Sequence, residues 1–310
     1  MKILITDKIH EKGIKVLQEN GFIIEKKFDL SPNDLKNRIG DYDGIIVRSA
    51  TKLNAEVLEK GKKLKFIGRA GVGLDNIDLE KCQELNITVL NTPKAPSVSV
   101  AELTIGLMIS LLRYIPKANT SMHCGEWHKS QLLGETLYGK TLGIIGFGNI
   151  GQEVAKRLES FKMKIGIFDI SKECLKMGKD LGYKIYESIE GLIKESQIIT
   201  LHLPVSNRTN RLIDESCFNL MNDDTLLINT ARGELIDEKA LLKALENNLI
   251  GGAALDVYSK EPLGEHDLCN YEENLILTPH IGSQTIETQI HASSMIAQKI
   301  IDFFNEMKEG

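Results

Sequence analysis

The sequence lacks the features that define several large classes of protein. Its five cysteines are scattered, odd in number and without paired spacing, so they favour free thiols in a reducing cytosol over a disulfide framework or a zinc site. The longest apolar run, LTIGLMISLL at 103–112, has about half the length that spans a bilayer. The N-terminus, MKILITDKIH, has too short an apolar run for a secretory signal. These absences predict a cytoplasmic protein that does not enter membranes.

An excess of charge of one sign is also missing. The 38 basic and 43 acidic residues leave a net charge of -5, which gives no general attraction to nucleic acid or to anionic membranes. No low-complexity tract interrupts a composition of 42% hydrophobic and 26% charged residues, which is typical of globular proteins. The length of 310 residues suits two domains of ordinary size.

Short strand-like runs alternate with amphipathic helical patterns along the chain. The first runs are KILIT, FIIE, GIIVRS, KFIGRA and ITVLN; after NTPKAPSVSVAE come TLGIIGFG, KIGIFDI, QIITLHLP, TLLINTARG, IGGAALDVY and NLILTPHIG. This alternation predicts an α/β fold with two doubly wound parallel-sheet units, joined near Pro93 and Pro96. A final helix is predicted over 284–307.

The clearest motif opens the second unit. In GIIGFGNIGQEVAKRL, the residues Gly146, Gly148 and Gly151 have the spacing G-x-G-x-x-G, directly after an apolar strand and at the start of an amphipathic helix. Glycines at these points allow a tight turn, a close approach of a pyrophosphate and close packing of helix on strand. A structural turn is the alternative for an isolated glycine triplet, but this context favours a dinucleotide site.

Asp169 ends the next predicted strand, KIGIFDI, eighteen residues after Gly151. A carboxylate at this point can accept hydrogen bonds from both hydroxyls of an adenosine ribose and would repel a 2′-phosphate, which favours NAD over NADP. The alternative is a helix N-cap, because DISKECLKMG continues into a helical pattern. Lys172 nearby could partly accommodate a phosphate, so the strictness of the preference stays open.

Three side chains that follow apolar runs are candidates for chemistry. Arg232 ends TLLINTARG, and a fixed cation at the carboxyl end of a strand suits an anionic ligand. His280 follows a strand and a proline in LTPHIG, where a structural histidine and a catalytic one are both possible. Glu261 lies in the charged segment SKEPLGE, and a solvated loop carboxylate is its alternative. No metal site is predicted, because the segment that holds His123, Cys124 and His128 has no trusted ligand spacing.

Several motifs in order resemble the D-isomer-specific 2-hydroxyacid dehydrogenases over essentially the whole chain. They are RAGVGLDNID at 69–78, VAELTIGLMISLLR at 100–113, GKTLGIIGFGNIG at 139–151, NTARGELIDEKAL at 229–241, GAALDVYSKEP at 252–262 and NLILTPHIG at 274–282. The resemblance implies a flavodoxin-like substrate-binding domain of residues 1–97 and 284–310. A Rossmann-type NAD-binding domain of residues 98–283 would be inserted into it.

The resemblance also implies roles for the three candidates. Arg232 would hold the carboxylate of a 2-hydroxy or 2-keto acid, helped by the backbone of Val72 and Gly73, because a planar guanidinium can bond a carboxylate bidentately. His280 would be the general acid in reduction and the base in oxidation, and Glu261 would pair with it and favour the imidazolium. Hydride would pass between NAD and the substrate carbon.

Further contacts with the cofactor follow from the same resemblance. Beyond the glycines and Asp169, the implied NAD-binding residues are Val72, Asn149, Ile150, Leu203, Thr230, Ala231, Arg232, Asp256, His280, Gly282 and Ser283. Asp256 would face the carboxamide, and Leu203 would lie beside the adenine. His202 is predicted to be structural.

The segment VRSATK at 47–52 resembles the branch of the family that acts on phosphoglycerate. Arg48 and Ser49 would then meet the substrate, with Arg48 suited to a phosphate, and Arg69 and Gln289 are further candidates. The expected reaction is the interconversion of 3-phosphoglycerate and 3-phosphohydroxypyruvate in serine biosynthesis. Pro96 departs from this pattern, because the family usually has an asparagine there, so glyoxylate or hydroxypyruvate reduction is the enzymatic alternative.

Partners are predicted from the resemblance as well. The apolar helix around 100–112 resembles the family's dimer-forming segment, so a homodimer is expected. The sequence ends at Gly310 and resembles a short form without the C-terminal regulatory domain, which predicts no inhibition by L-serine. An NADH-sensing corepressor that turns over substrate poorly is the alternative from another class.

Overall fold

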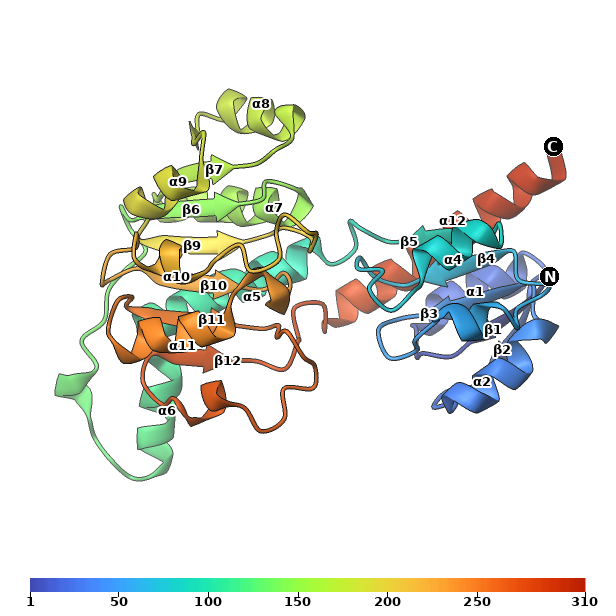
Figure 1. Cartoon of the computed structure of the whole chain (residues 1–310), viewed down its shortest axis with the longest axis horizontal. Helices are drawn as coiled ribbons and strands as arrows, with labels where there is room; N and C mark the ends of the chain where they lie inside the picture. Colours follow the sequence, from blue (N-terminus) through green and yellow to red (C-terminus); the bar gives the residue numbers. More distant parts are fainter. Residues whose placement is uncertain (310) are drawn as a thin grey trace. The chain divides into compact units, whose positions relative to one another are not determined.

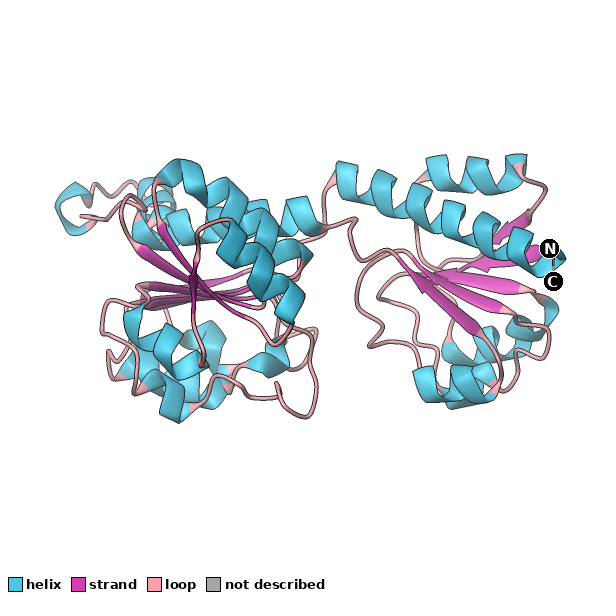
Figure 2. Ribbon diagram, turned by 90° about the horizontal axis from the view of Figure 1, so that it is seen from above, coloured by secondary structure: helices cyan, strands magenta, loops and turns pink. Residues whose placement is uncertain are grey.

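The computed structural model describes residues 1–309 and divides into two compact units. Unit 1 comprises Met1–Ser97 together with the chain from Ser283 onward, and unit 2 comprises Val98–Gly282. Each unit is built on its own parallel sheet, and in each the helices cover both faces of the sheet (Figures 1 and 2). Each unit is described by itself below.

Unit 1 has a five-stranded parallel sheet within the described residues, in the order β2-β1-β3-β4-β5, which is the flavodoxin-like order. Its strands are β1 (Lys2–Ile5), β2 (Ile23–Lys26), β3 (Gly44–Val47), β4 (Phe66–Arg69) and β5 (Thr88–Asn91). Its helices are α1 (Glu11–Glu19), α2 (Pro32–Arg38), α3 (Ala55–Leu58), α4 (Leu79–Glu84) and α12 (Ile286–Glu309), with a 3-10 turn η1 at Ile39–Asp41. The central strands are buried runs of isoleucine, leucine and valine, as expected for strands covered on both faces.

Helix α12 returns to unit 1 and completes one of its two cores. Ile296 and Ile300 are fully buried against the first strands and α1. Phe303 meets Phe66 and Phe304 meets Phe22 in edge-to-face contacts with ring centroids 5.8 and 5.2 Å apart. The predicted apolar face of this helix is therefore used for packing within unit 1.

Unit 2 has a seven-stranded parallel sheet in its described part, in the order β12-β11-β10-β9-β6-β7-β8, which contains the Rossmann order. Its strands are β6 (Thr141–Ile145), β7 (Lys164–Phe168), β8 (Lys184–Ile185), β9 (Ile198–Leu201), β10 (Leu226–Asn229), β11 (Gly252–Leu255) and β12 (Leu275–Leu277). The helices are α5 (Ser97–Leu112), α6 (Ile115–His123), α7 (Asn149–Leu158), α8 (Lys172–Asp180), α9 (Ile189–Glu195), α10 (Glu215–Phe218) and α11 (Glu238–Glu246). Shorter 3-10 turns are η2 (Lys129–Gln131), η3 (Glu159–Phe161), η4 (Gly233–Leu235) and η5 (Asp267–Asn270).

The apolar helix α5 packs against unit 2's own sheet. Met108 and Leu111 are fully buried in the same core as Leu142 and Ile144 of β6. Across residues 1–309, no single helix is long and apolar enough to cross a membrane; α5 and α6 pass that criterion only as a pair, which is bent by 66°.

Both sheets are parallel, so the carboxyl ends of their strands lie along one edge of each sheet. In unit 2 this edge carries Gly146 after β6, Asp169 after β7, Arg232 after β10 and His280 after β12. In unit 1 the corresponding edge carries Arg48 after β3. The topology therefore gathers the candidate residues of each unit at the edge where ligands bind in such folds.

Candidate active site

The glycine motif forms the turn from β6 into α7, and each glycine meets a different requirement. Gly146 has a φ of 96°, and a Cβ there would lie 2.5 Å from the backbone oxygen of His202. A Cβ at Gly151 would lie 2.3 Å from the oxygen of Gly146, which explains the close packing of helix on strand. Gly148, by contrast, would meet no described atom within 4 Å, and it caps α7 without a side-chain hydrogen bond. The amino end of α7 is thus open for a phosphate, which fits a dinucleotide.

Asp169 links this turn to the loop that follows β7 by two hydrogen bonds. Its Oδ2 accepts a hydrogen bond from the backbone N–H of Phe147 at 2.6 Å, and its Oδ1 accepts one from Ser171 at 2.7 Å. The N-cap of α8 is Ser171, whose hydroxyl accepts from Cys174 N–H. The helix-cap alternative for Asp169 was therefore wrong. Its half-buried carboxylate keeps the position that a ribose-binding acid requires.

Asp256 follows β11 and holds the loop after β12. Only 1% of Asp256 is exposed. Its Oδ1 accepts hydrogen bonds from Thr278 Oγ1 at 2.6 Å and from Ile281 N–H at 2.8 Å. Its Oδ2 accepts one from Gly282 N–H at 2.8 Å. His280 lies inside this loop with a left-handed φ of 53°, a conformation that is uncommon for residues other than glycine. A buried carboxylate thus holds the Thr278 side chain before His280 and the backbone of the two residues after it.

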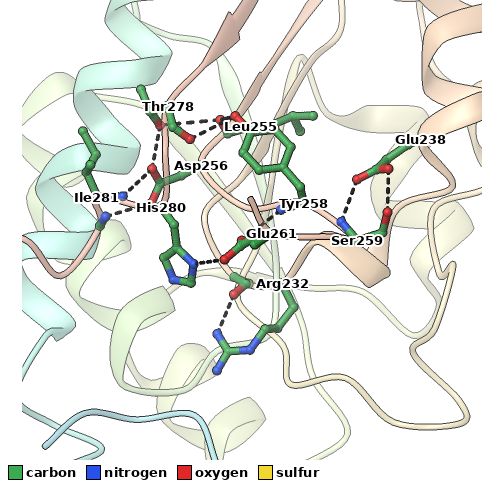
Figure 3. Close-up of polar contacts among 12 residues, drawn as sticks. Arg232, Glu238, Leu255, Asp256, Tyr258, Ser259, Glu261, Thr278, His280 and Ile281 are labelled. Carbon is green, nitrogen blue, oxygen red and sulfur yellow. Dashed lines mark hydrogen bonds and ion pairs between the residues drawn. The ribbon is translucent and has the colours of Figure 1, made fainter. Parts of the chain in front are cut away.

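His280 and Glu261 form a close pair. The imidazole Nδ1 of His280 lies 2.7 Å from Glu261 Oε2, and Figure 3 shows the ring directed at that carboxylate. Glu261 Oε1 also accepts from the backbone N–H of Tyr258 at 3.2 Å, so the carboxylate is oriented by its own loop. The side chains of His280 and Glu261 are 43% and 37% exposed. With Nδ1 engaged by the carboxylate, Nε2 is the nitrogen that can exchange a proton with a ligand.

Arg232 lies at the end of β10 in a backbone shaped by Asn229. The buried Asn229 side chain donates to the backbone oxygen of Arg232 at 2.7 Å and accepts from Ala231 N–H at 3.0 Å. The guanidinium donates from Nη1 to the oxygen of Ala231 at 2.7 Å (Figure 3). Asn229 was missed by the sequence prediction, although its place at a strand end in INTARG is the signal that marks it.

A second carboxylate steadies the loop that carries Glu261. Glu238, the first residue of α11, accepts from the backbone N–H of Ser259 at 2.7 Å and from its hydroxyl at 2.6 Å (Figure 3). A Cβ at Gly233 would lie 1.8 Å from the carbonyl carbon of Tyr258, so only glycine allows η4 to approach this loop. The sequence prediction also missed Glu238.

The remaining predicted residues of unit 2 lie at the same edge of its sheet. Thr230 is buried with its hydroxyl 2.9 Å from that of Thr104, and Leu203 follows β9 beside His202. Asn149 and Ile150 are the first two residues of α7, and Gly282 is buried after β12. The structure therefore brings the unit 2 residues together at one edge, as the topology requires.

In unit 1, the predicted residues lie in turns after β3 and β4. Arg48 is half-buried and Ser49 is exposed in the turn after β3, while Val72 and Gly73 follow β4. The oxygen of Val72 accepts from the side chain of Asn91 at 2.8 Å, which fixes the glycine-rich turn. Ser283, predicted to touch the cofactor, is the first residue of unit 1's second segment.

The predicted structural histidine, His202, differs from His280. Its Nε2 lies 3.1 Å from the hydroxyl of Thr200, and its buried Nδ1 has no hydrogen-bond partner among the described residues. Burial lowers the pKa of His202 to about 3. Within residues 1–309, no three His, Cys, Asp or Glu side chains are placed to hold a metal ion.

A doubly wound sheet with a G-x-G-x-x-G turn and an acid after the next strand defines a dinucleotide-binding domain of the Rossmann type. Residues 105–282 match the family model for the D-isomer specific 2-hydroxyacid dehydrogenase, NAD binding domain. The chain belongs to the D-isomer specific 2-hydroxyacid dehydrogenases. The family and the α/β fold predicted from the sequence are confirmed.

Similar proteins carry several names within this family. The D-3-phosphoglycerate dehydrogenase of Methanocaldococcus jannaschii is 45% identical over 302 residues, which cover 97% of this chain and 57% of the relative. The hydroxypyruvate reductase of Thermotoga maritima is 40% identical over 302 residues, covering 96% of this chain and 97% of the relative. The crystal structure of a glyoxylate reductase from Paecilomyes thermophila superposes with a TM-score of 0.86 at 31% identity, covering 97% of this chain and 94% of that chain. The chain thus spans just over half the length of the phosphoglycerate dehydrogenase and nearly all of the two reductases.

Proposed function

We propose that the protein is an NAD-dependent oxidoreductase that interconverts a D-2-hydroxy acid and the corresponding 2-keto acid. The observation that carries this proposal is the pair of His280 and Glu261, 2.7 Å apart, in the same unit as the glycine turn and Arg232. An imidazole held by a carboxylate is a proton donor and acceptor of the kind that carbonyl reduction needs. Unit 2 is proposed as the NAD-binding domain and unit 1 as the substrate-binding domain.

In this mechanism, the chain's own residues bind the acid and move one proton. The turn of Gly146, Gly148 and Gly151 would hold the pyrophosphate of NAD, and Asp169 would accept hydrogen bonds from the ribose hydroxyls. When bound, the nicotinamide supplies the hydride in reduction and accepts it in oxidation. Arg232 holds the substrate carboxylate. His280 Nε2 donates a proton to the keto oxygen during reduction and takes it back during oxidation.

Glu261 lies against Nδ1, where its negative charge stabilises the imidazolium form of His280. The loop bonds from Asp256 and Glu238 keep both members of the pair in place. A proton donor that is already oriented lowers the reorganisation that the transition state requires. The mechanism therefore assigns Asp256 and Glu238 to positioning. The carboxamide contact proposed for Asp256 stays a prediction.

For the substrate, we propose 3-phosphohydroxypyruvate and its reduced partner 3-phosphoglycerate. The half-buried Arg48 supplies a cation suited to a phosphate, and several relatives are named D-3-phosphoglycerate dehydrogenase. Hydroxypyruvate or glyoxylate reduction is the second candidate. It is favoured by Pro96, which lacks the side chain of the usual asparagine, and by the reductase relative, which matches over 97% of its length.

A comparison of kcat/KM for phosphohydroxypyruvate, hydroxypyruvate and glyoxylate with NADH tests the proposal. The highest value is expected for phosphohydroxypyruvate. A higher value for hydroxypyruvate or glyoxylate would contradict the proposed substrate but would agree with the proposed reaction. No turnover on any of the three would contradict the proposal that the protein is an enzyme and would favour a binding protein that senses NADH.

We further propose a homodimer formed by α5 and the segment that follows it. Most apolar side chains of α5 are used in unit 2's own core, whereas Trp127 and Leu133 in the next segment are 75% and 88% exposed. Large exposed apolar side chains of this kind are typical of interfaces. Light scattering should show a dimer for the natural chain and a monomer for Trp127→Ser/Leu133→Ser. A monomeric natural chain at micromolar concentration would contradict the proposal.

A further inference from the structure

The turn that carries Arg48 is tied down by a residue from another strand. Asp7, which lies just after β1 and is 9% exposed, accepts hydrogen bonds from the backbone N–H of Arg48 at 2.6 Å and of Thr51 at 3.2 Å. Its other oxygen, Oδ1, accepts from the Thr51 hydroxyl at 2.7 Å. One carboxylate thus holds both ends of the turn from Arg48 to Thr51.

A second side chain holds the carbonyl groups of the same two residues. Asn76 donates from Nδ2 to the backbone oxygen of Arg48 at 2.8 Å and to that of Thr51 at 2.7 Å. Asp7 and Asn76 therefore fix both the amides and the carbonyls that bound the turn. Two side chains thus hold this turn by four hydrogen bonds to its backbone, and the turn carries Arg48 and Ser49.

We propose that Asp7 is a positioning residue that sets the backbone of this turn so that Arg48 binds the phosphate of the substrate. The inference rests on the proposed function, in which Arg48 has that role. A guanidinium discriminates between ligands only when its donors are held in a fixed direction, because its fork must match the oxygens of the anion. The side chain of Arg48 has several rotatable bonds. A fixed backbone at Arg48 therefore limits where its guanidinium can lie.

Asp7 also acts on the charge of Arg48. Burial lowers the pKa of Arg48, and the negative charge of Asp7 opposes that shift. Asp7 therefore favours the charged guanidinium while its oxygens are occupied by the turn. An uncharged asparagine of the same shape would lose this effect and would have only one oxygen as an acceptor.

The chain offers a matched control at the opposite edge of the same pair of strands. Asp43, just before β3, accepts from the backbone N–H of Lys2 at 2.7 Å, and β1 pairs with β3. Asp43 thus links the amino ends of the two strands as Asp7 links their carboxyl ends. Loss of either carboxylate weakens unit 1, but only Asp7 bears on the turn of Arg48.

The test compares Asp7→Asn, Asp43→Asn and Arg48→Ala with the natural chain, using NADH-linked reduction of phosphohydroxypyruvate and hydroxypyruvate. For Asp7→Asn, the KM for phosphohydroxypyruvate should rise about tenfold, with kcat and the KM values for hydroxypyruvate and NADH changed less than about twofold. Asp43→Asn should leave all of these nearly unchanged. Thr51→Val, a milder change that removes one bond to Asp7, should give a smaller rise with the same selectivity.

The double variant Asp7→Asn/Arg48→Ala separates positioning from general damage. Because Asp7 acts through Arg48, the double variant should bind phosphohydroxypyruvate no more weakly than Arg48→Ala alone. Additive losses, or an equal rise in KM for both keto acids, would overturn the inference and leave the proposed function intact. An Arg48→Ala variant with unchanged kcat/KM for phosphohydroxypyruvate would instead overturn the phosphate-binding role itself, and the inference with it.

Discussion

Two histidines follow strands of the same sheet in unit 2, and they have opposite environments. His202 follows β9, with its Nε2 near the Thr200 hydroxyl and its Nδ1 buried without a partner among the described residues. His280 follows β12, with Nδ1 2.7 Å from the Glu261 carboxylate and 43% of its side chain exposed. Burial lowers the pKa of His202 to about 3, so this ring stays neutral at any pH near 7.

The comparison shows that a place at the ligand-binding edge does not by itself make a histidine an acid or a base. A ring that cycles a proton needs a group that stabilises its charged form and access for the reacting atom. His280 has both, whereas His202 has neither. The backbone oxygen of His202 instead lies so close to Gly146 that a Cβ there would clash with it. Position on the sheet and chemistry are therefore separate properties.

The largest expected difference is in turnover. His280→Ala should lower kcat for keto acid reduction by about a hundredfold or more, the usual scale of acid–base assistance. His202→Gln should keep kcat within about threefold, because its ring takes no part in proton transfer. Steady-state NADH oxidation checks both. Similar losses in the two variants would remove the distinction between the histidines.

Loss of the ribose acceptor should have the next largest effect. Asp169→Ala removes a charged acceptor, and such hydrogen bonds are worth roughly 1.5 to 3 kcal/mol, so the KM for NADH should rise about tenfold or more. The preference for NADH over NADPH should narrow, because the repulsion of a 2′-phosphate is also lost. Because Asp169 also holds Phe147 N–H, Asp169→Asn provides a milder comparison. Unchanged KM values for both cofactors would reject the role.

A smaller effect is expected from the partner of His280. Glu261→Gln keeps the shape of the pair but removes the negative charge that favours the imidazolium. The kcat for reduction should then fall, but by less than in His280→Ala, because the proton donor is still present while the charge that stabilises its imidazolium is lost. Steady-state NADH oxidation at one fixed pH measures this. An unchanged kcat would separate Glu261 from the proton transfer.

The smallest expected effect concerns stability in acid. The pKa of His202 is lowered in the folded chain. As the pH falls below about 6.5, the imidazole therefore binds a proton in the unfolded chain but stays neutral in the folded chain. Lowering the pH from 8 to 5 should therefore reduce the free energy of unfolding by about 1 to 2 kcal/mol through this one group. Urea unfolding at several pH values should show a shallower loss for His202→Gln. Parallel curves for the two proteins would contradict this account of His202.

Much of the architecture could be predicted from local patterns. Apolar runs of strand length, the spacing of Gly146, Gly148 and Gly151, and an acid after the next strand are all contained in short segments. Arg232 and His280 became candidates because each follows such a run. These features depend on neighbours in the sequence, so the sequence is enough to find them.

The residues that hold the site in place were harder to find. Glu238 binds Ser259 across 21 positions, and Asp7 binds the turn of Arg48 across 41. A single aspartate after a strand or at the start of a helix has the same local appearance whether it caps a helix or fixes a distant loop. The surroundings of Asp169 also suit an N-cap, which was the alternative to its predicted role, but Ser171 provides the cap of α8.

The central claim is that His280, held by Glu261, donates the proton in reduction and accepts it in oxidation. Its most direct test is the pH dependence of kcat/KM in both directions, with phosphohydroxypyruvate and NADH and with 3-phosphoglycerate and NAD. Because the same group is acid in one direction and base in the other, reduction should slow and oxidation should accelerate as the pH rises over the same range. Two profiles that rise or fall together would contradict the claim.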